Sequence, residues 1–166
     1  MVSLELLRCY PFFGGLDTDQ LNILAKLADE MTVEAEHIFF REGDSVDHFY
    51  LVREGVIGIA FEIPARDVKH KLSDQFDRSL QSQDVVISTV GPGEVFGWSG
   101  LISPHQATAK AKTMTPAKIV AIDCQELRQI FEKDCRFAHL MTQKAAQVTR
   151  QRLHDMRIEW LAYLVD

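Results

Sequence analysis

Short hydrophobic runs separated by glycine turns fill the middle of the chain, from residue 31 to residue 123. The runs at 37–40, 48–52, 56–63 and 85–90 are rich in β-branched and aromatic residues. Such runs are typical of β-strands, and their spacing is close to that of a β-sandwich or barrel. The turns between them contain the glycines Gly43, Gly55, Gly91 and Gly93. The sequence therefore predicts a mainly β domain.

The residues before this region follow a helical period instead. Residues 3–30 are predicted to be helical, with a break at the sequence PFFGG and with Asp17 as the N-cap of the second part. Apolar residues then recur at helical spacing, at Leu21, Leu24, Ala25, Leu27 and Ala28. We expect this face to pack against something larger.

One late segment of the β region shows strict alternation. Ala107, Ala109 and Ala111 alternate with Thr108, Lys110 and Lys112. Because successive side chains of a strand point to opposite faces, the pattern predicts one inward apolar face and one outward polar face.

Residues 62–84 interrupt the β pattern. The segment is polar and follows neither a strand period nor a helical period. We interpret it as a long excursion between two paired strands. It is either a solvated extended hairpin or a lid or partner-docking loop.

The C-terminal part of the chain returns to helical spacing. A short helix is predicted over 125–133, and a long one from about Asp134 to about Tyr163. The first apolar stripe of the long helix is Phe137, Leu140, Met141, Ala145 and Val148. The second, spaced 4, 3, 4 and 3 residues apart, is Thr149, Leu153, Met156, Trp160 and Tyr163.

This second spacing is that of a coiled-coil seam. We therefore expect the long helix to pack first on its own domain and then on a second copy of the chain. The homodimer would form through Leu153, Met156, Trp160 and Tyr163. The alternative is one helix that wraps only its own core.

Composition and charge exclude several classes of protein. The 166 residues are 46% hydrophobic and 25% charged, with a formal net charge of −6. A mildly acidic chain is a poor nucleic-acid binder, so we expect no direct DNA binding. There is no apolar run of about 18 residues and no signal-peptide pattern, so neither a membrane partner nor secretion is expected, and the predicted location is cytoplasmic.

Motifs for catalysis and metal binding are missing from the sequence. The three cysteines contain no CxxC pair, and the six histidines follow no metal-ligand spacing. No catalytic or metal-binding residues are predicted, and we expect a protein that is not an enzyme.

Residues 91–108, GPGEVFGWSGLISPHQAT, have the plan of a phosphate-binding cassette. They predict a strand end, a glycine turn, one helical turn and a new strand. The first turn of a helix presents unpaired backbone N–H groups and the positive end of its dipole, and both favour an anion. The N–H groups of Trp98, Ser99 and Gly100 are the expected donors.

The order of these elements resembles the cyclic-nucleotide-binding domain of the catabolite-activator (Crp/Fnr) superfamily. The resemblance covers nearly the whole chain and depends on PFFGGL, FREGDSVDHFYLVREGVIGI, GPGEVFGWSGLI and ATAKAKT in this order. It implies a β-roll (a double-stranded β-helix or jelly roll) with N-terminal helices over 1–133 and a C-terminal dimerisation helix over 134–166. Transcription factors of this superfamily continue into a helix-turn-helix domain, which is not expected here.

The cassette departs from the family pattern at the positions that carry its chemistry. In the family, Phe-Gly-Glu precedes a helical turn and Arg-Ser/Thr-Ala follows it; the glutamate takes the ribose hydroxyl and the arginine takes the cyclic phosphate. Here Trp98 replaces the glutamate, His105 the arginine and Gln106 the hydroxyl residue. Each of the two lost contacts is expected to cost about 1.5–3 kcal/mol, and together they reduce affinity by about two to four decades. An imidazole is only partly protonated near neutral pH, so His105 is a weak substitute.

Three interpretations of function remain open. The first is a non-enzymatic regulatory or sensor module that binds a small anionic effector at the 96–108 cassette and signals through the C-terminal helix. The second is a ligand-free structural module for dimerisation or interaction, in which the indole of Trp98 plugs the pocket beside Gly97 rather than stacking on a ligand. The third is a genuine cyclic AMP or cyclic GMP binder. The candidate ligand-binding residues are Phe96, Gly97, Trp98, Ser99, Gly100, His105, Gln106, Ala107 and Thr149.

Overall fold

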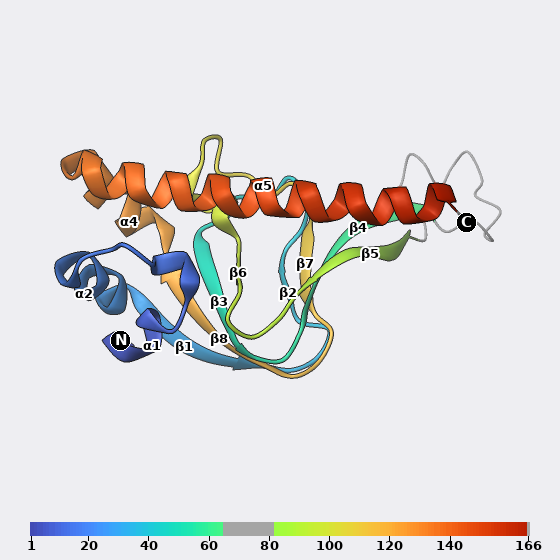
Figure 1. Cartoon of the computed structure of the whole chain (residues 1–166). Coiled ribbons are helices and arrows are strands. Elements are labelled where there is room, and N and C mark those ends of the chain that lie inside the picture. The colour runs from blue at the N-terminus through green and yellow to red at the C-terminus, as the bar shows by residue number, and fades with distance from the viewer. Residues whose placement is uncertain (65–81, 166) are drawn as a thin grey trace.

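The chain folds into a β-roll with helices at both ends (Figure 1). The computed structural model describes residues 1–64 and 82–165, with side chains described as far as residue 162 in the last helix. Its two antiparallel sheets and flanking helices are the mainly β jelly roll that the sequence predicts.

Eight strands form the two sheets. They are β1 (Ala28–Val33), β2 (Ile38–Phe40), β3 (His48–Glu54), β4 (Ile57–Pro64), β5 (Ser82–Val90), β6 (Val95–Phe96), β7 (Lys110–Thr113) and β8 (Ala117–Asp123). The first sheet has the order β1-β8-β3-β6, and the second has the order β2-β7-β4-β5. Apart from the consecutive strands β4 and β5, neighbours in each sheet are not consecutive in sequence, so the sheets are built largely by non-local pairing.

The N-terminal segment holds two short helices and a 3-10 turn: α1 (Leu4–Arg8), η1 (Pro11–Phe13) and α2 (Thr18–Lys26). Asp17 is the N-cap of α2, as predicted: its carboxylate accepts from the Gln20 N–H at 2.9 Å, and the Gln20 side chain accepts from the Asp17 N–H at 3.1 Å. This reciprocal capping box stabilises the start of the helix by about 1 kcal/mol.

The prediction that the helix extends to residue 30 is wrong. α2 ends at Lys26, and the chain from Ala28 onward is strand β1. β1 pairs with β8 along its whole length, from Ala28 opposite Ile122 to Val33 opposite Ala117. This pairing with a strand about 90 residues away in sequence overrides the local helical period of Leu27 and Ala28.

β4 and β5 form a long hairpin whose pairing runs out to Pro64 opposite Ser82. The ends of the predicted 62–84 excursion are thus paired strands, and the rest of that segment, residues 65–81, lies outside the described residues, so the choice between an extended hairpin and a lid or docking loop is untested there. β5 ends the second sheet, and its side chains Val85, Val86 and Ile87 are exposed.

The alternating segment 107–112 behaves only partly as predicted. Ala107 and Ala111 are buried, but strand β7 begins only at Lys110. Lys110 is not a solvated outward residue, since its side chain is 8% exposed and donates to Glu62 at 2.7 Å and to Asp84 at 2.9 Å. The prediction of an outward, solvent-exposed polar face is wrong at this position because ion pairs cover the lysine.

The same network extends to the next lysine. Lys112 contacts Asp84 at 3.0 Å and Glu36 at 2.9 Å. Burial alone would raise the pKa of Asp84, but hydrogen bonds from Lys110 and Lys112 outweigh it and lower that pKa. The hydrogen bonds to Glu36 and Asp84 raise the pKa of Lys112.

Two hydrophobic clusters form the core. The helical cluster joins the N-terminal helices to β3 and the C-terminal helices, and it includes Leu7, Phe12, Phe13, Leu24, Phe49, Leu127, Phe137 and Met141. The sheet cluster lies between the sheets and comprises Val33, Tyr50, Val52, Ile57, Val90, Phe96, Ala111, Ala117 and Ile119.

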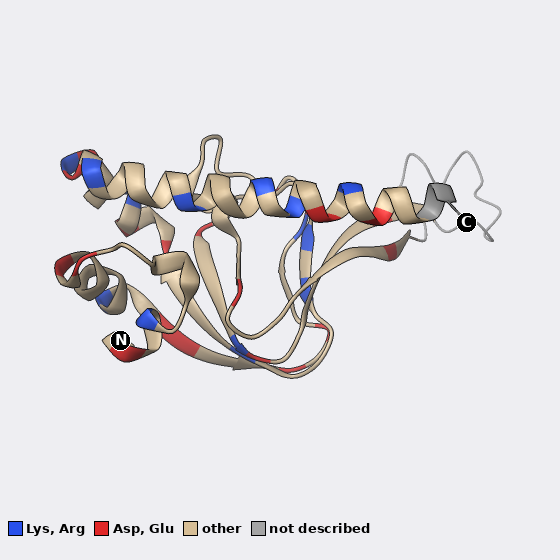
Figure 2. Ribbon diagram, viewed as in Figure 1, with Lys and Arg blue, Asp and Glu red and all other residues tan. Residues whose placement is uncertain are grey.

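The chain ends in two helices, α4 (Cys124–Lys133) and α5 (Cys135–Val165), as the spacing predicts. Asp134 caps α5 by accepting from the Phe137 N–H at 2.9 Å. α5 runs along the whole domain, from the helical cluster to past the described ends of β4 and β5 (Figure 1). Acidic and basic residues are interspersed along it (Figure 2). None of the helices within residues 1–64 and 82–165 has the length and apolar character needed to span a bilayer.

α5 divides into two segments. In the docked segment, residues 135–152, Phe137, Met141 and Ala145 are fully buried, while Leu140 and Val148 are half-buried. In the free segment, residues 153–162, every residue is exposed. The first predicted stripe is therefore covered by its own domain, whereas the members of the second stripe up to Trp160 are exposed.

Candidate functional site

The cassette begins where β6 meets β3. Phe96 pairs with Tyr50 in this short ladder. Gly97 then turns the chain at φ 75°, in the left-handed region, into the 3-10 turn η2 (Trp98–Leu101). A Cβ at Gly97 would also lie 2.9 Å from the His48 carbonyl oxygen. Backbone conformation and space therefore both require glycine here.

The far end of η2 is anchored on α4. A Cβ at Gly100 would lie 2.6 Å from the Val46 carbonyl oxygen and 2.8 Å from the Cys124 sulfur. Arg128 on α4 donates from Nη1 to the Gly100 carbonyl oxygen at 2.7 Å. Burial raises the pKa of the Cys124 thiol to about 12. The turn is thus held tightly against the first residues of α4.

The returning segment, residues 105–107, lies beside the loop at 43–46. His105 accepts at its carbonyl from the Val46 N–H at 2.9 Å. Gln106 forms an isolated bridge with Ser45. Ala107 is buried, and its N–H donates to the Asp44 carbonyl at 2.8 Å. These bonds fix the backbone at the positions where the family pattern has Arg-Ser/Thr-Ala.

One of the expected anion donors is already used. The Gly100 N–H donates to the Gly97 carbonyl oxygen at 3.1 Å. The prediction of three free donors is therefore wrong at Gly100. A 3-10 turn closes its bonds after three residues, so only the N–H groups of Trp98 and Ser99 remain at the start of the turn.

Phe96 and Ser99 occupy different environments. The Phe96 ring is fully buried and stacks on Tyr50, with ring centroids 4.7 Å apart and planes 12° apart. Burial raises the pKa of Tyr50 to about 12. Ser99 is half-buried on the turn itself. Phe96 therefore holds the strand end in place, whereas Ser99 remains partly open to solvent.

Trp98 lies between the cassette and α5. Its indole is half-buried and packs against the helical cluster, not the sheet cluster that surrounds Phe96. The Arg152 guanidinium carbon lies 5.5 Å from the centre of the Trp98 rings, a cation–π contact. The turn η2 and α5 are in contact, and these two side chains form part of that junction.

The sequence interpretation missed Arg152, although a signal was present. Residues Phe137, Met141, Ala145, Val148 and Arg152 are spaced 4, 4, 3 and 4 residues apart. Arg152 therefore continues the face of α5 that packs on the domain. This spacing predicts that Arg152 lies on the packed face of α5, but it does not identify the residue that Arg152 contacts.

Two unpaired polar atoms belong to this region. In the described part of the chain, the only buried side-chain nitrogen or oxygen atoms that lack a hydrogen-bond partner are His105 Nδ1 and Arg152 Nε. Buried polar atoms are nearly always paired in native proteins, so an unpaired one requires an explanation. One of these atoms is on the returning segment of the cassette, and the other is on α5, which contacts the cassette at η2.

Thr149 lies one helical turn before Arg152 on α5. Its hydroxyl donates to the Ala145 carbonyl oxygen at 2.9 Å. The hydroxyl proton is therefore used within the helix, and the oxygen keeps only its acceptor capacity.

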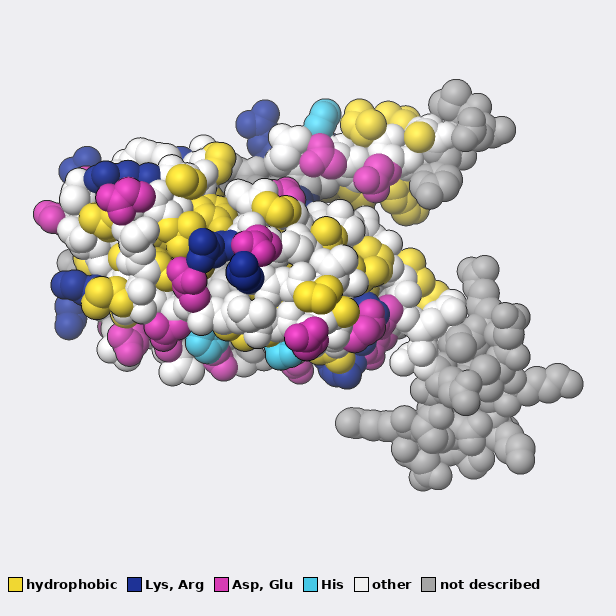
Figure 3. All heavy atoms as spheres, turned by 90° about the horizontal axis from the view of Figure 1, so that it is seen from below, with side chains coloured by type: hydrophobic (Ala, Val, Ile, Leu, Met, Phe, Trp, Pro, Cys, Tyr) yellow, Lys and Arg dark blue, Asp and Glu magenta, His cyan; other side chains and the backbone are white. Residues whose placement is uncertain are grey.

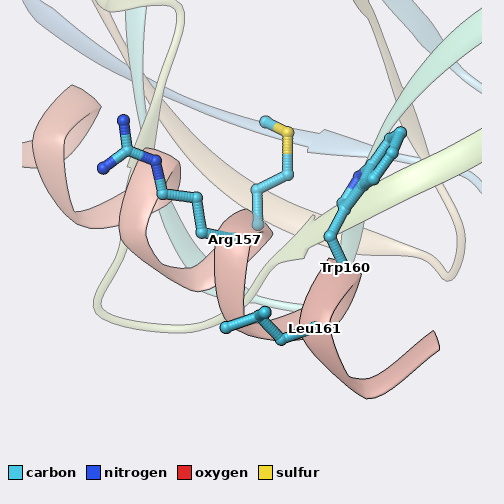
Figure 4. Close-up of a pocket in the computed structure, with 4 residues that line it drawn as sticks. Arg157, Trp160 and Leu161 are labelled. Carbon is cyan, nitrogen blue, oxygen red and sulfur yellow. The ribbon is translucent and has the colours of Figure 1, made fainter. Parts of the chain in front are cut away.

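The predicted seam lies on the free segment. Leu153, Met156 and Trp160 are 45%, 44% and 68% exposed; the Tyr163 side chain is not among those described. Met156, Arg157, Trp160 and Leu161 line a hollow of about 430 Å³ along the helix (Figure 4). Hydrophobic side chains gather near this end of α5, where the helix projects past the body of the domain (Figure 3). Dimerisation through this face stays a prediction.

Within residues 1–64 and 82–165, no three His, Cys, Asp or Glu side chains gather in a way that could hold a metal ion.

Comparisons with known proteins agree with this architecture. The family model of the cyclic nucleotide-binding domain matches residues 30–134, more than half of the chain. The CRP-like cAMP-activated global transcriptional regulator of Mycobacterium tuberculosis is 23% identical over 124 residues. That alignment covers 75% of this chain and 48% of the regulator, so the chain spans about half the length of this curated relative.

Two solved structures are similar over most of the chain. A protein from Geobacter metallireducens GS-15 superposes with a TM-score of 0.75 at 27% identity, covering 93% of this chain and 100% of that one. A cyclic nucleotide-binding-like protein from Brucella abortus superposes with a TM-score of 0.55 at 27% identity, covering 78% and 97%.

Proposed function

Because the chain belongs to the cyclic nucleotide-binding domain family, we propose that it is a regulatory module that binds a small anionic effector at the cassette. Binding is passed on through α5, whose docked segment covers η2. The module has no enzymatic activity of its own. It works as a homodimer joined through the seam on the free segment.

The pair of unpaired buried atoms at His105 and Arg152 carries this proposal. A purely structural module gains nothing from buried nitrogen atoms without partners, and each one costs about 1–3 kcal/mol. A ligand with acceptor oxygens would satisfy Arg152 Nε, and one that also reached His105 would accept from Nδ1 when that nitrogen carries the proton. The glycine turn at Gly97 keeps the backbone of a ligand-binding cassette in place.

The ligand-free alternative depends on Trp98. Its half-buried indole packs on the helical cluster and fills space between η2 and α5. If this packing is the whole role of Trp98, the domain serves dimerisation or protein interaction only. The alternative predicts that no small anion stabilises the folded domain.

Genuine binding of cyclic AMP or cyclic GMP is the third candidate. The M. tuberculosis relative is named as cAMP-activated, but that protein is about twice as long as this chain. Here Trp98 and His105 stand where the family has its glutamate and arginine. Replacing them, as Trp98→Glu with His105→Arg, should raise cyclic-nucleotide affinity. If it does not, the residue assignment within the cassette is wrong.

Thermal unfolding in the presence of candidate ligands tests the proposal. The protein is unfolded alone and with millimolar cyclic AMP, cyclic GMP, inorganic phosphate or adenosine, the last as a neutral control. A ligand at about 100 times its dissociation constant adds about 2.7 kcal/mol. For a domain of this size that corresponds to about 5–10 °C in Tm. A rise with the anions but not with adenosine supports the proposal; no rise with any of them supports the ligand-free alternative.

A further inference from the structure

We infer that Arg152 of α5, held over the indole of Trp98, supplies the positive charge that binds a phosphate group at this site. The inference rests on the proposed function and deepens it, because it assigns the main cationic contact with the anion to the C-terminal helix, in place of the arginine that the family has in the cassette. The ligand class is a small molecule with a phosphate or phosphodiester group.

The charge balance around Arg152 supports this assignment. The side chain is half-buried, yet none of the ion pairs among the described residues includes it. The carboxylate of Asp155, one turn further along α5, instead accepts from Gln151 at 2.8 Å. A partly desolvated guanidinium is costly without an anionic partner. The uncompensated charge therefore points to an anion from outside the chain.

The contact with Trp98 prepares the guanidinium for such a ligand. A guanidinium on an aromatic face keeps its N–H donors in its own plane, where they can form the paired hydrogen bonds that suit phosphate. Arg152 Nε is such a donor, and it is buried and unpaired. The tryptophan that replaces the family glutamate thus acts as a platform for a cation.

In this proposal the cassette supplies the remaining donors to the phosphate. His105 Nδ1 is the second unpaired buried atom, and the N–H groups of Trp98 and Ser99 begin the turn. A phosphate held by groups on η2 and on α5 binds only when the two are in contact. Ligand binding and docking of α5 then stabilise each other, because the ligand binds the protein with α5 docked more tightly than the protein with α5 undocked.

Fluorescence of Trp98 provides a direct readout. The chain has two tryptophans, so Trp160→Phe leaves Trp98 as the only one. Inorganic phosphate, cyclic AMP and adenosine are titrated into this variant. Saturable change in Trp98 emission is expected with phosphate and cyclic AMP and not with adenosine. The relative affinity of these two probes shows whether the natural source is free phosphate or a nucleotide.

Substitutions of arginine in the same background test the assignment. Arg152→Met should weaken binding of the phosphate probes by about 10- to 100-fold. Arg152→Lys keeps the positive charge but loses the paired N–H donors of the guanidinium. Its affinity for the phosphate probes should lie between those of Arg152→Met and the parent. Arg150→Met, an exposed arginine two residues away, is the matched control and should bind like the parent. Circular dichroism checks that each variant keeps its helical content.

The outcomes separate the two proposals. If the Trp160→Phe protein binds phosphate and Arg152→Met binds it equally well, this inference is overturned and the proposed function stands. If neither the Trp160→Phe protein nor the natural protein binds any phosphate probe, the proposed function fails and this inference fails with it.

Discussion

The docked and free segments of α5 have similar hydrophobic spacing but opposite surroundings. In the docked segment, Phe137, Met141 and Ala145 have no exposed surface. In the free segment, Leu153 and Trp160 continue the helical repeat and remain 45% and 68% exposed. An amphipathic pattern shows that a face needs a cover, but it does not show whether the same chain provides that cover.

The largest expected difference is between the reaction rates of two thiols, one buried in the core and one exposed at the start of α5. Cys124 is buried in the helical cluster, and burial raises its pKa to about 12, whereas Cys135 is exposed. The variants Cys9→Ser/Cys135→Ser and Cys9→Ser/Cys124→Ala leave one thiol each. At pH 8 the rate of reaction with a disulfide reagent should be about 1,000-fold lower for Cys124. Similar rates would mean that the docked segment opens readily.

Truncating a docked residue should cost far more stability than truncating a free one. Phe137→Ala is expected to lower the free energy of unfolding by about 3–5 kcal/mol, because it leaves a cavity in the helical cluster. Leu161→Ala, the matched control on the free segment, should change it by less than about 0.5 kcal/mol. Chemical denaturation in a Leu153→Glu/Trp160→Glu background removes any contribution from self-association. Equal losses would contradict the division of α5.

The seam is tested by adding charge to one face of the free segment. Leu153→Glu with Trp160→Glu should weaken the proposed homodimer by at least about 100-fold, as measured by sedimentation velocity. Ile158 lies about 200° around the helix from Trp160, so Ile158→Glu is the control and should leave the dimer intact. If Ile158→Glu dissociates the dimer and the double variant does not, the interface lies on the other face. A monomeric natural protein would favour one helix that serves only its own core.

The ion pairs of the second sheet should affect stability without affecting the seam, and their effect is the smallest. Asp84→Asn is expected to destabilise the fold by about 1–2 kcal/mol, because it removes an acceptor of both Lys110 and Lys112. The folded pKa of Asp84 is lowered, so its contribution is fully present above the unfolded value near 4 and disappears as pH falls through the folded pKa. The difference between the natural protein and Asp84→Asn should therefore shrink below about pH 4.

The pKa of Lys112 is shifted in the opposite direction, and this shift sets an upper pH limit to the stabilisation. Its folded pKa is raised, so its contribution is complete below the unfolded value near 10.5 and disappears as pH rises through the folded pKa. Denaturant titrations from pH 3 to 11 check both limits. A constant difference across this range would show that these ion pairs do not contribute to stability. A dimer that dissociates in Asp84→Asn would show that the free segment depends on the sheet.

The features that local sequence determines could be predicted. The Asp17 cap, the glycine turn at Gly97 and the period of α5 each depend on residues within a few positions of one another. Even the family could be suggested from the order of these segments. Residues close in sequence determine these features, without contacts from distant parts of the chain.

The predictions that failed concern features that depend on residues distant in sequence. Ala28 lies in a strand because Ile122 pairs with it, and Lys110 is buried because Asp84 reaches it. Trp98 could be assigned no partner from sequence, because Arg152 comes from a helix 54 residues later. Such contacts follow from topology and cannot be deduced from local spacing.

Strand β5 creates a choice between two kinds of assembly. It ends its sheet and exposes Val85, Val86 and Ile87 in a row, with Asp84 as its only charge. The proposed α5 seam would close after two copies, whereas pairing at one strand edge can leave a further edge free to add neighbours and so begin a fibril. Concentrated or partly unfolded protein therefore risks open-ended growth along this edge. One lysine at Val86 would oppose that growth and leave the closed dimer unchanged.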